Sequence, residues 1–404
     1  MLNNNGVISK AKDAKNQYAG AQTNEEKHFN EVTDWIDTKV GDTTGGGSEP
    51  GGSGDSTTGG GSAGGSGDST TKVDGVPIPE GYYYVGGTKA KGMVISDNVA
   101  DKELDKGKEN VRRDLAGNQW VWVPVETPSS LYTTIDAGVA LSGSTGVKTT
   151  KYTNTIISGQ TRGLPGSTNY REYREPDIVT TYDNDTNAKT AGFSSLTNMA
   201  ENMKSDYEEM IASLEKYKGF YIGRYELTAN GEKTGATQTS VNWYTLYKNC
   251  TTLASGTKVK TRMIWGLQWD ATCNWLAGSG FDITDSTSWG NYKDNTATGH
   301  GSKQNTGYSE SWKANNIYDF AGNCDELTQE AYGTNGRATG GGYYFSSGSD
   351  RPASFRSCNA PFSPYGFSSS RPTLYLIPWE IEAMSSKEEI KTSMTEEKTE
   401  RRLC

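Results

Sequence analysis

The sequence predicts an α+β fold of short strands, two helices and long irregular loops, preceded by an N-terminal helix and a Gly/Ser-rich linker. Short runs of aromatic and β-branched residues separated by glycines indicate the strands, and two stretches with apolar residues at helical spacing indicate the helices. Only 33% of the 404 residues are hydrophobic, and 49 are glycine. The folded part is therefore expected to be smaller than the chain length alone would allow.

The first 72 residues predict a tether. Residues 1–40 are expected to form a helix, because Val7, Ala11, Ala14 and the apolar residues after them recur at helical spacing. Residues 41–72 contain two near-copies of GDTTGGGSEPGGS and nothing that buries apolar surface, so they are expected to be a flexible linker. A coil of this length separates its ends by on the order of 30 Å, as in a protein that displays a head away from its anchor.

Residues 73–378 are expected to form the head. Strands are predicted at Tyr82–Val85, Met93–Ile95 and Asn118–Val125, where aromatic and β-branched residues concentrate. The polar residues 126–200 show little periodicity and are expected to form long loops.

The two predicted helices are Met203–Lys218 and Met263–Leu276, which carry apolar residues at helical spacing. The second helix contains Trp265, Trp269 and Trp275, and these tryptophans are expected to pack in the core rather than to bind a ligand. Residues 379–404 are dominated by Lys, Glu and Ser and are expected to be a charged tail, either a loose helix or a disordered end.

The most unusual composition belongs to Gly340–Arg371, called the variable stretch below. It holds nine Ser and seven aromatic residues but no aliphatic residue larger than Ala or Pro. Tyr, Ser, Gly and Asn also dominate antibody binding loops; the alternative is an ordinary Gly/Ser-rich surface loop. The stretch lacks Lys, Glu, Gln, Trp and Met, none of which is encoded by a codon ending in C. If the adenines of Asn codons (AAC) were randomised, the resulting codons would encode residues such as Phe, Ser, Tyr, Asn, Asp and Gly, which are found in the stretch, and could not encode the five that are missing.

The residues around the variable stretch resemble the formylglycine-generating-enzyme (sulfatase-modifying factor) family. Asn316-Ile317-Tyr318-Asp319, with Gly322-Asn323, follows its N-I-Y-D-x-x-G-N pattern, and Gly341-Gly342 follows its R-G-G pattern. Within that family the chain is most similar to the variable proteins of diversity-generating retroelements, over roughly Gly117 to Leu376. It departs from the family where tryptophans give way to Asp325 and Leu327, an arginine to Gly340, and Gly-Phe to Ser369-Ser370.

The resemblance implies a C-type-lectin-like fold in which Asn118–Val125 pairs with Phe220–Glu226. It also implies that mutagenesis rewrites the last region to change the ligand, and that Arg356 and Arg371 are structural. The side chains expected to face outward and bind the ligand are Tyr344, Phe345, Ser346, Ser347, Asp350, Phe355, Ser357, Cys358, Asn359, Phe362, Tyr365 and Phe367.

The sequence offers few residues for catalysis. It has two histidines and no nucleophile-elbow, P-loop or dinucleotide-binding motif. The family's oxidase binds copper through two cysteines, and those positions hold Ser346 and Arg351 here, so no Cu(I) site and no enzyme activity are expected. The five cysteines form no CxxC pair; one disulfide, for example Cys250–Cys273, is compatible with an exported protein.

A calcium site is the one metal site that the resemblance implies. Asp319 and Glu326 would supply carboxylates, and Gly322 and Cys324 would supply backbone carbonyls, which are the hard oxygen ligands that Ca²⁺ prefers. The alternative is a turn whose carboxylates cap nearby N–H groups. Calcium would be structural, and no cofactor is required.

The predicted function is that of a non-catalytic, ligand-binding display protein on a bacterial surface or, alternatively, on a phage virion. The expected partner is a protein or glycan on another cell or particle, because the net charge of −9 disfavours nucleic acid. Membrane attachment is expected only through a missing N-terminal anchor, since Asn5–Ala11 resembles the segment after the membrane helix of Gram-positive type-IV-pilin-like proteins. The alternatives are a formylglycine-generating-enzyme-like oxidase, a calcium-dependent carbohydrate-binding lectin and a pilin-like structural subunit.

Overall fold

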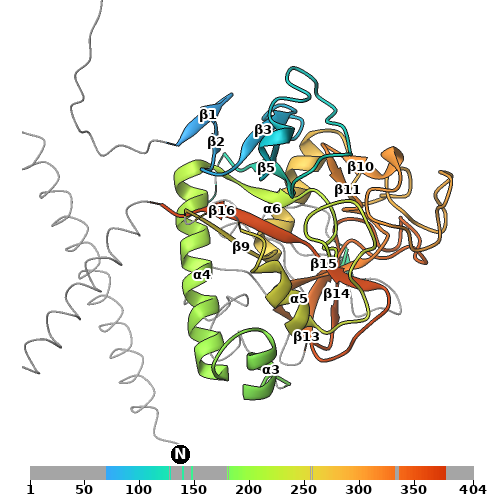
Figure 1. The fold of residues 1–404 in the computed structure, drawn as a ribbon. Helices are drawn as coiled ribbons and strands as arrows, with labels where there is room; N and C mark the ends of the chain where they lie inside the picture. The colour runs from blue at the N-terminus through green and yellow to red at the C-terminus, as the bar shows by residue number, and fades with distance from the viewer. Residues whose placement is uncertain are drawn as a thin grey trace, which may run out of the picture. The chain divides into compact units, whose positions relative to one another are not determined.

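The chain divides into two units, Met1–Ser66 and Gly67–Cys404, and the computed structural model describes residues of the second (Figure 1). The predicted N-terminal helix, almost all of the linker and the tail 379–404 lie outside the described residues. Those are 70–126, 128, 139–140, 147–148, 180, 182–254, 256, 258–332 and 336–378.

The described residues form an α+β structure with two six-stranded sheets. The first sheet is antiparallel throughout. In spatial order its strands are β3 (Tyr83–Gly86), β4 (Val94–Ser96), β5 (Gln119–Pro124), β8 (Gly219–Gly223), β16 (Pro372–Leu376) and β9 (Val259–Met263).

The second sheet carries the variable stretch. In spatial order its strands are β15 (Ser368–Ser370), β12 (Asp325–Tyr332), β13 (Gly336–Gly340), β14 (Phe355–Asn359), β7 (Val147–Lys148) and β6 (Val139–Ala140). Two hairpins and two 3₁₀ turns complete the smaller elements: β1 (Thr71–Val73) with β2 (Val76–Ile78), β10 (Lys313–Ala314) with β11 (Ile317–Tyr318), η1 (Val99–Asp101) and η2 (Glu310–Trp312).

Alternation along β5 gives the first sheet two buried faces. Trp120 and Trp122 pack in one apolar cluster, whereas Val121 and Val123 pack in another, because successive side chains of a strand point to opposite faces. β5 pairs with β8 as predicted, with Trp122 opposite Tyr221.

The helices differ from the prediction in number and in bounds. The described residues contain four: α3 (Asp185–Thr190), α4 (Leu196–Tyr217), α5 (Trp243–Cys250) and α6 (Gly266–Gly278). α4 begins before Met203 because Ser195 Oγ caps it, accepting a hydrogen bond from the Asn198 N–H. α6 begins after Met263 because Val259–Met263 pairs with β16 instead. The prediction of loops throughout 126–200 is wrong where α3, β6, β7 and the start of α4 lie.

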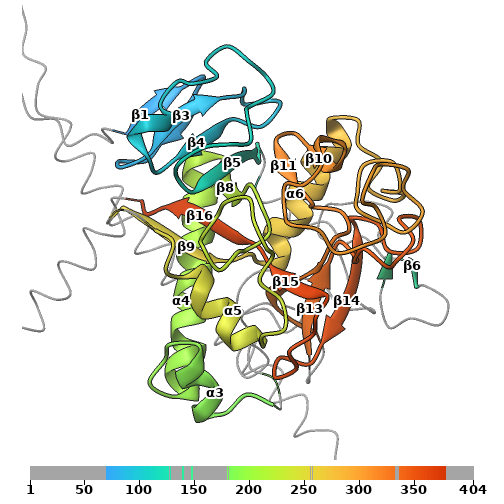
Figure 2. The same ribbon diagram turned by 45° about the vertical axis from the view of Figure 1, so that its right-hand side comes forward.

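α5 and α6 connect the two sheets, because α5 contacts β9 and β15 and α6 contacts β5 and β12. Figures 1 and 2 show α4 beside β9 and β16, while β13, β14 and β15 lie on the other side of α5 and α6. Trp265 and Trp269 are fully buried, as expected of core residues, and Trp275 is partly buried. The middle of the variable stretch contacts α6 through Trp269 and Asp270.

Two further observations concern the helices. None of the helices that the structure describes combines the length and the hydrophobicity needed to cross a membrane. Cys250, at the end of α5, is a free thiol packed in the apolar core, so the Cys250–Cys273 disulfide does not form.

Candidate ligand-binding surface

The two ends of the variable stretch lie on the two sides of a single strand of the second sheet, β12. β12 pairs antiparallel with β13, which places Glu326 opposite Gly340, and parallel with β15, which places Glu326 opposite Ser369. Arg371 follows β15 directly. Both ends of the stretch are therefore held by β12.

Arg371 joins the end of the stretch to three strands. Its Nε donates to Glu326 Oε2 (2.9 Å) and its Nη2 to Glu326 Oε1 (2.6 Å). The guanidinium also donates to the carbonyl oxygens of Gly223 (3.0 Å) in β8 and Tyr318 (2.9 Å) in β11. Arg371 and Glu326 are buried, and a bidentate pair of this kind fixes geometry as well as charge.

Gly340 is required by the close approach of Trp269. A Cβ at position 340 would lie 2.4 Å from Trp269 Cε2. The indole cannot move away, because it stacks on Phe320 with ring centroids 4.0 Å apart. The arginine that the resembling family carries at this position would not fit here.

The middle of the stretch, Pro352–Arg356, is buried and is called the anchor segment below. Trp269 Nε1 donates to the Ala353 carbonyl oxygen (2.9 Å), and Arg356 forms buried ion pairs with Asp270 and Glu330. Phe355 is 0% exposed. The prediction that Phe355 faces outward is wrong, because the stretch is fastened to the core at this point and its ring fills the interior.

The anchor segment divides the surface of the stretch into two lobes, Tyr343–Arg351 and Ser357–Phe367. Rings from both lobes stack where the lobes meet: Tyr343 and Phe367 have centroids 4.7 Å apart, and Phe367 and Tyr365 have centroids 5.3 Å apart. This ring stack ties the lobes together.

A loop outside the stretch fixes the first lobe. Ser347 Oγ donates to Asp294 Oδ2 (2.6 Å), and the Gly348 N–H donates to Asp294 Oδ1 (3.0 Å). Burial acts to raise the pKa of Asp294, but these hydrogen bonds outweigh it and lower that pKa below its ordinary value. Asp294 is thus a charged acceptor that holds the lobe, and no sequence motif singled it out.

The turn at the tip of the first lobe sorts its residues. The Ser346 N–H donates to the Tyr343 carbonyl oxygen (2.8 Å), and Ser346 is buried, so the prediction that Ser346 faces outward is also wrong. The same turn leaves Phe345 67% exposed.

Most of the other predicted ligand-binding residues reach the surface. Asp350 and Phe362 are exposed, Phe362 by 48%. The half-buried members of the set are Tyr344, Ser347, Ser357, Cys358, Asn359, Tyr365 and Phe367.

The two carboxylates predicted to bind calcium have other partners. Arg371 occupies both oxygens of Glu326, and Asp319 Oδ2 accepts hydrogen bonds from the Gly307 N–H (2.7 Å) and Thr306 Oγ1 (3.0 Å). Of the four oxygens of these two carboxylates, Asp319 Oδ1 is buried without a partner, and burial raises the pKa of Asp319 to about 6. Across the described ranges, no group of three or more His, Cys, Asp or Glu side chains is placed to hold a metal ion. The arrangement does not fit a calcium ion.

We therefore expect a chelator to leave the melting temperature of the full chain unchanged, because an ion must bind the native state to stabilise it. Melting curves with EDTA and with added calcium measure this. A melting temperature that falls with EDTA in the wild type but not in Asp319→Ala would contradict this expectation and support calcium binding.

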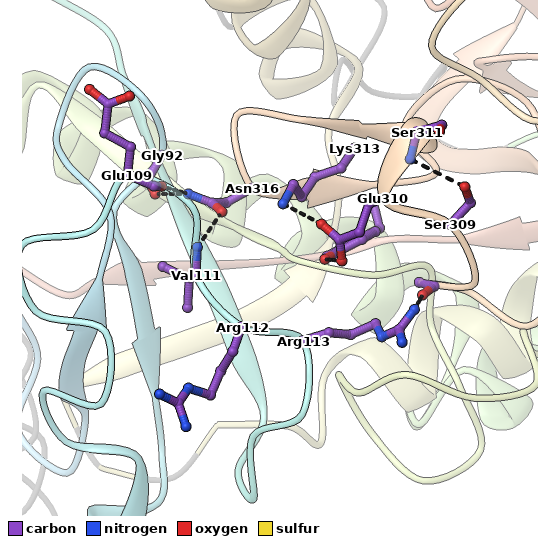
Figure 3. A network of polar contacts seen from close by, with 12 residues as sticks. Gly92, Glu109, Val111, Arg112, Arg113, Ser309, Glu310, Ser311, Lys313 and Asn316 are labelled. Atoms are coloured by element: carbon purple, nitrogen blue, oxygen red, sulfur yellow. Dashed lines mark hydrogen bonds and ion pairs between the residues drawn. The ribbon is translucent and has the colours of Figure 1, made fainter.

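The Asn316 side chain, from the family-like motif, has a structural task. Its Nδ2 donates to the carbonyl oxygens of Gly92 (2.8 Å) and Glu109 (2.8 Å), and its Oδ1 accepts from the Val111 N–H (3.1 Å) (Figure 3). An open cleft of about 520 Å³ lies beside these hydrogen bonds. It is lined by Asp105, Lys108, Asn110, Val111, Arg112, Asp114, Glu310 and Lys313.

The charges of this cleft are largely paired with one another. Asp105 pairs with Lys108 (2.7 Å) and Arg112 (3.0 Å), and Glu310 pairs with Lys313 (2.5 Å). None of the lining residues belongs to the variable stretch. The cleft is therefore separate from the candidate surface.

Comparisons with known proteins find distant structural likenesses. No protein-family model and no curated protein matches this chain. The Treponema denticola variable protein 1 aligns with a TM-score of 0.30 and 16% identity, covering 40% of this chain and 85% of that one. A structure described as the crystal structure of CarF aligns with a TM-score of 0.31 and 12% identity, covering 40% of this chain and 87% of that one.

Proposed function

We propose that this chain is a non-catalytic display protein whose variable stretch is a ligand surface, rewritten by a retroelement to change its target. In this proposal the head has a C-type-lectin-like fold of the formylglycine-generating-enzyme type. The protein acts outside a bacterial cell, or on a phage virion, and needs no cofactor.

The contrast within the variable stretch supports this proposal best. Phe345 and Phe362 are large apolar residues that remain 67% and 48% exposed, whereas Phe355, Arg356 and Arg371 are buried. Exposed aromatic rings among small polar residues suit a binding loop. Because the anchor segment already holds the two lobes in place, little conformational entropy would be lost when a partner binds the variable stretch.

The alternative functions have less support from the same residues. Ser346 and Arg351 stand where the resembling oxidase has thiolates, and the Arg351 guanidinium lies over the rings of Tyr343 and Phe355 (5.4 and 4.9 Å). A calcium-dependent lectin needs a calcium ion that a sugar can reach, but the side chains of Asp319 and Glu326 are buried and accept hydrogen bonds from other groups of the protein. Both observations favour a surface that binds through side chains alone.

A peptide library tests the proposal even though the natural partner is unidentified. Random dodecapeptides displayed on phage are panned against the full chain, and the affinities of the selected peptides are measured for single variants. We expect Phe345→Ala and Phe362→Ala each to weaken binding by about tenfold or more, because exposed aromatic residues on rigid mounts act as hot spots.

The matched control is Tyr308→Ala. Tyr308 is 45% exposed, like Phe362, but lies outside the variable stretch, so its removal should leave binding unchanged. Peptides that bind Phe345→Ala and Phe362→Ala as tightly as the wild type would refute the variable stretch as the ligand surface.

A further inference from the structure

We infer that Tyr182, which lies outside the variable stretch, is a fixed part of the ligand surface and that the partner it contacts is a protein. This inference rests on the proposed function. It divides the surface into positions that diversification rewrites and at least one position that stays constant.

Tyr182 and Phe362 form an exposed aromatic pair. Their ring centroids are 4.7 Å apart and their planes are inclined by 68°, an edge-to-face geometry that aromatic rings favour. Both rings remain substantially exposed, Tyr182 by 41% and Phe362 by 48%. Two aromatic residues from distant parts of the chain thus share one patch at the edge of the second lobe.

The Tyr182 turn is mounted on a buried ion pair. Asp183 Oδ2 accepts from Arg337 Nη2 (3.0 Å) and from the Thr180 N–H (2.6 Å), and Tyr244 donates its hydroxyl to the other oxygen. The side chains of Arg337 and Asp183 are fully buried. Arg337 belongs to β13, the strand that leads into the variable stretch, so the turn and the stretch share a support.

Phe362 is mounted on the same support. The backbone N–H of Trp243, at the start of α5, donates to the Pro361 carbonyl oxygen (2.9 Å). The Trp243 ring covers the Arg337 guanidinium at 4.2 Å. One residue therefore holds the backbone beside Phe362 and packs on the ion pair beneath Tyr182.

The geometry of the pair is consequently set by residues that lie outside the variable stretch. Whichever side chain diversification places at position 362, it faces the Tyr182 ring. Tyr182 then contributes the same contact to every variant, and position 362 selects among partners.

The chemistry of this patch favours a protein partner. Arg337 is buried and its charge is neutralised by Asp183, so this cation is not available to phosphate groups. In the inclined pair the edge of one ring covers part of the face of the other, which leaves less flat ring face for a sugar to stack on. Aromatic residues surrounded by small polar ones are enriched at protein interfaces.

The test uses the peptides selected on the full-length wild type. We expect Tyr182→Ala to weaken a substantial share of them by about tenfold, and Tyr182→Phe, which keeps the ring pair, to bind them almost as tightly as the wild type. Tyr308→Ala remains the exposed-tyrosine control. Melting temperatures equal to the wild type show that the variants are folded, and Tyr182→Ser replaces Tyr182→Ala if the latter does not fold.

The outcomes separate this inference from the proposed function. If Phe345→Ala and Phe362→Ala weaken binding while Tyr182→Ala does not, the variable stretch is the ligand surface and Tyr182 is no part of it. If none of the three variants weakens binding, the proposed function itself fails. A glycan-array signal that Phe362→Ala abolishes and Tyr182→Ala leaves intact would also overturn the assignment of Tyr182.

Discussion

Replacing Arg371 by alanine is expected to lower the free energy of unfolding by about 3–5 kcal/mol, because removing one partner leaves the other charge buried and unpaired. In this protein the orphaned group is the Glu326 carboxylate, which is itself buried. The carbonyl oxygens of Gly223 and Tyr318 lose the hydrogen bonds from Arg371 as well, so the loss is expected toward the upper end of this range. Denaturant unfolding of the full chain measures the change.

Arg351→Ala is the matched control for Arg371→Ala. Arg351 lies in the same stretch but is half-buried and lies over two aromatic rings, contacts worth about 0.5–1 kcal/mol at exposed sites. Equal losses for the two variants would contradict the view that Arg371 is the fastening at the end of the stretch.

Phe355→Ala is expected to cost about 3–5 kcal/mol, the usual loss when a buried phenylalanine is truncated and its cavity stays open. Phe345→Ala should change the free energy of unfolding by no more than about 0.5 kcal/mol, as is usual for surface positions. The two residues have the same side chain and lie ten positions apart in one stretch, so the comparison isolates burial.

Urea unfolding curves of the two variants provide the measurement. A loss for Phe345→Ala as large as that for Phe355→Ala would mean that the first lobe is part of the core. The idea of a ligand surface at Phe345 would then be wrong.

Periodicity in the sequence locates the longer elements better than the shorter ones. α4 is predictable because Met203, Tyr207, Met210 and Leu214 form a stripe on one face, and all four are buried. α3 and α5 are too short for such a stripe to stand out, and they form because Asn184 and Asn242 cap them and because the core covers them. The local sequence pattern does not reveal which short segments the core will cover and stabilise as helices.

Composition identifies the candidate surface but cannot orient its side chains. The stretch stands out by its Ser and aromatic content, yet Phe345 and Phe355 are identical residues with opposite fates. Phe355 is buried because the anchor segment contacts α6, which lies more than 70 positions earlier in the chain. Arg356 forms an ion pair with Asp270, and Trp269 donates a hydrogen bond to the Ala353 carbonyl oxygen. Tyr182 and Asp294 give no signal in the sequence for the same reason, since each becomes part of the surface only through folding.

The two strands that bracket the variable stretch have a consequence for its length. β13 and β15 lie on either side of β12, and neighbouring strands are about 4.8 Å apart, so the ends of the stretch are held about 10 Å apart whatever lies between them. Doubling the length of a flexible loop with fixed ends costs only about 0.6 kcal/mol of closure entropy. Insertions in the loops outside the strands, within Tyr343–Arg351 or 360–367, are therefore expected to change the stability of the fold only slightly as long as the anchor segment and β14 survive. The scaffold therefore accommodates a stretch of different length as well as of different sequence.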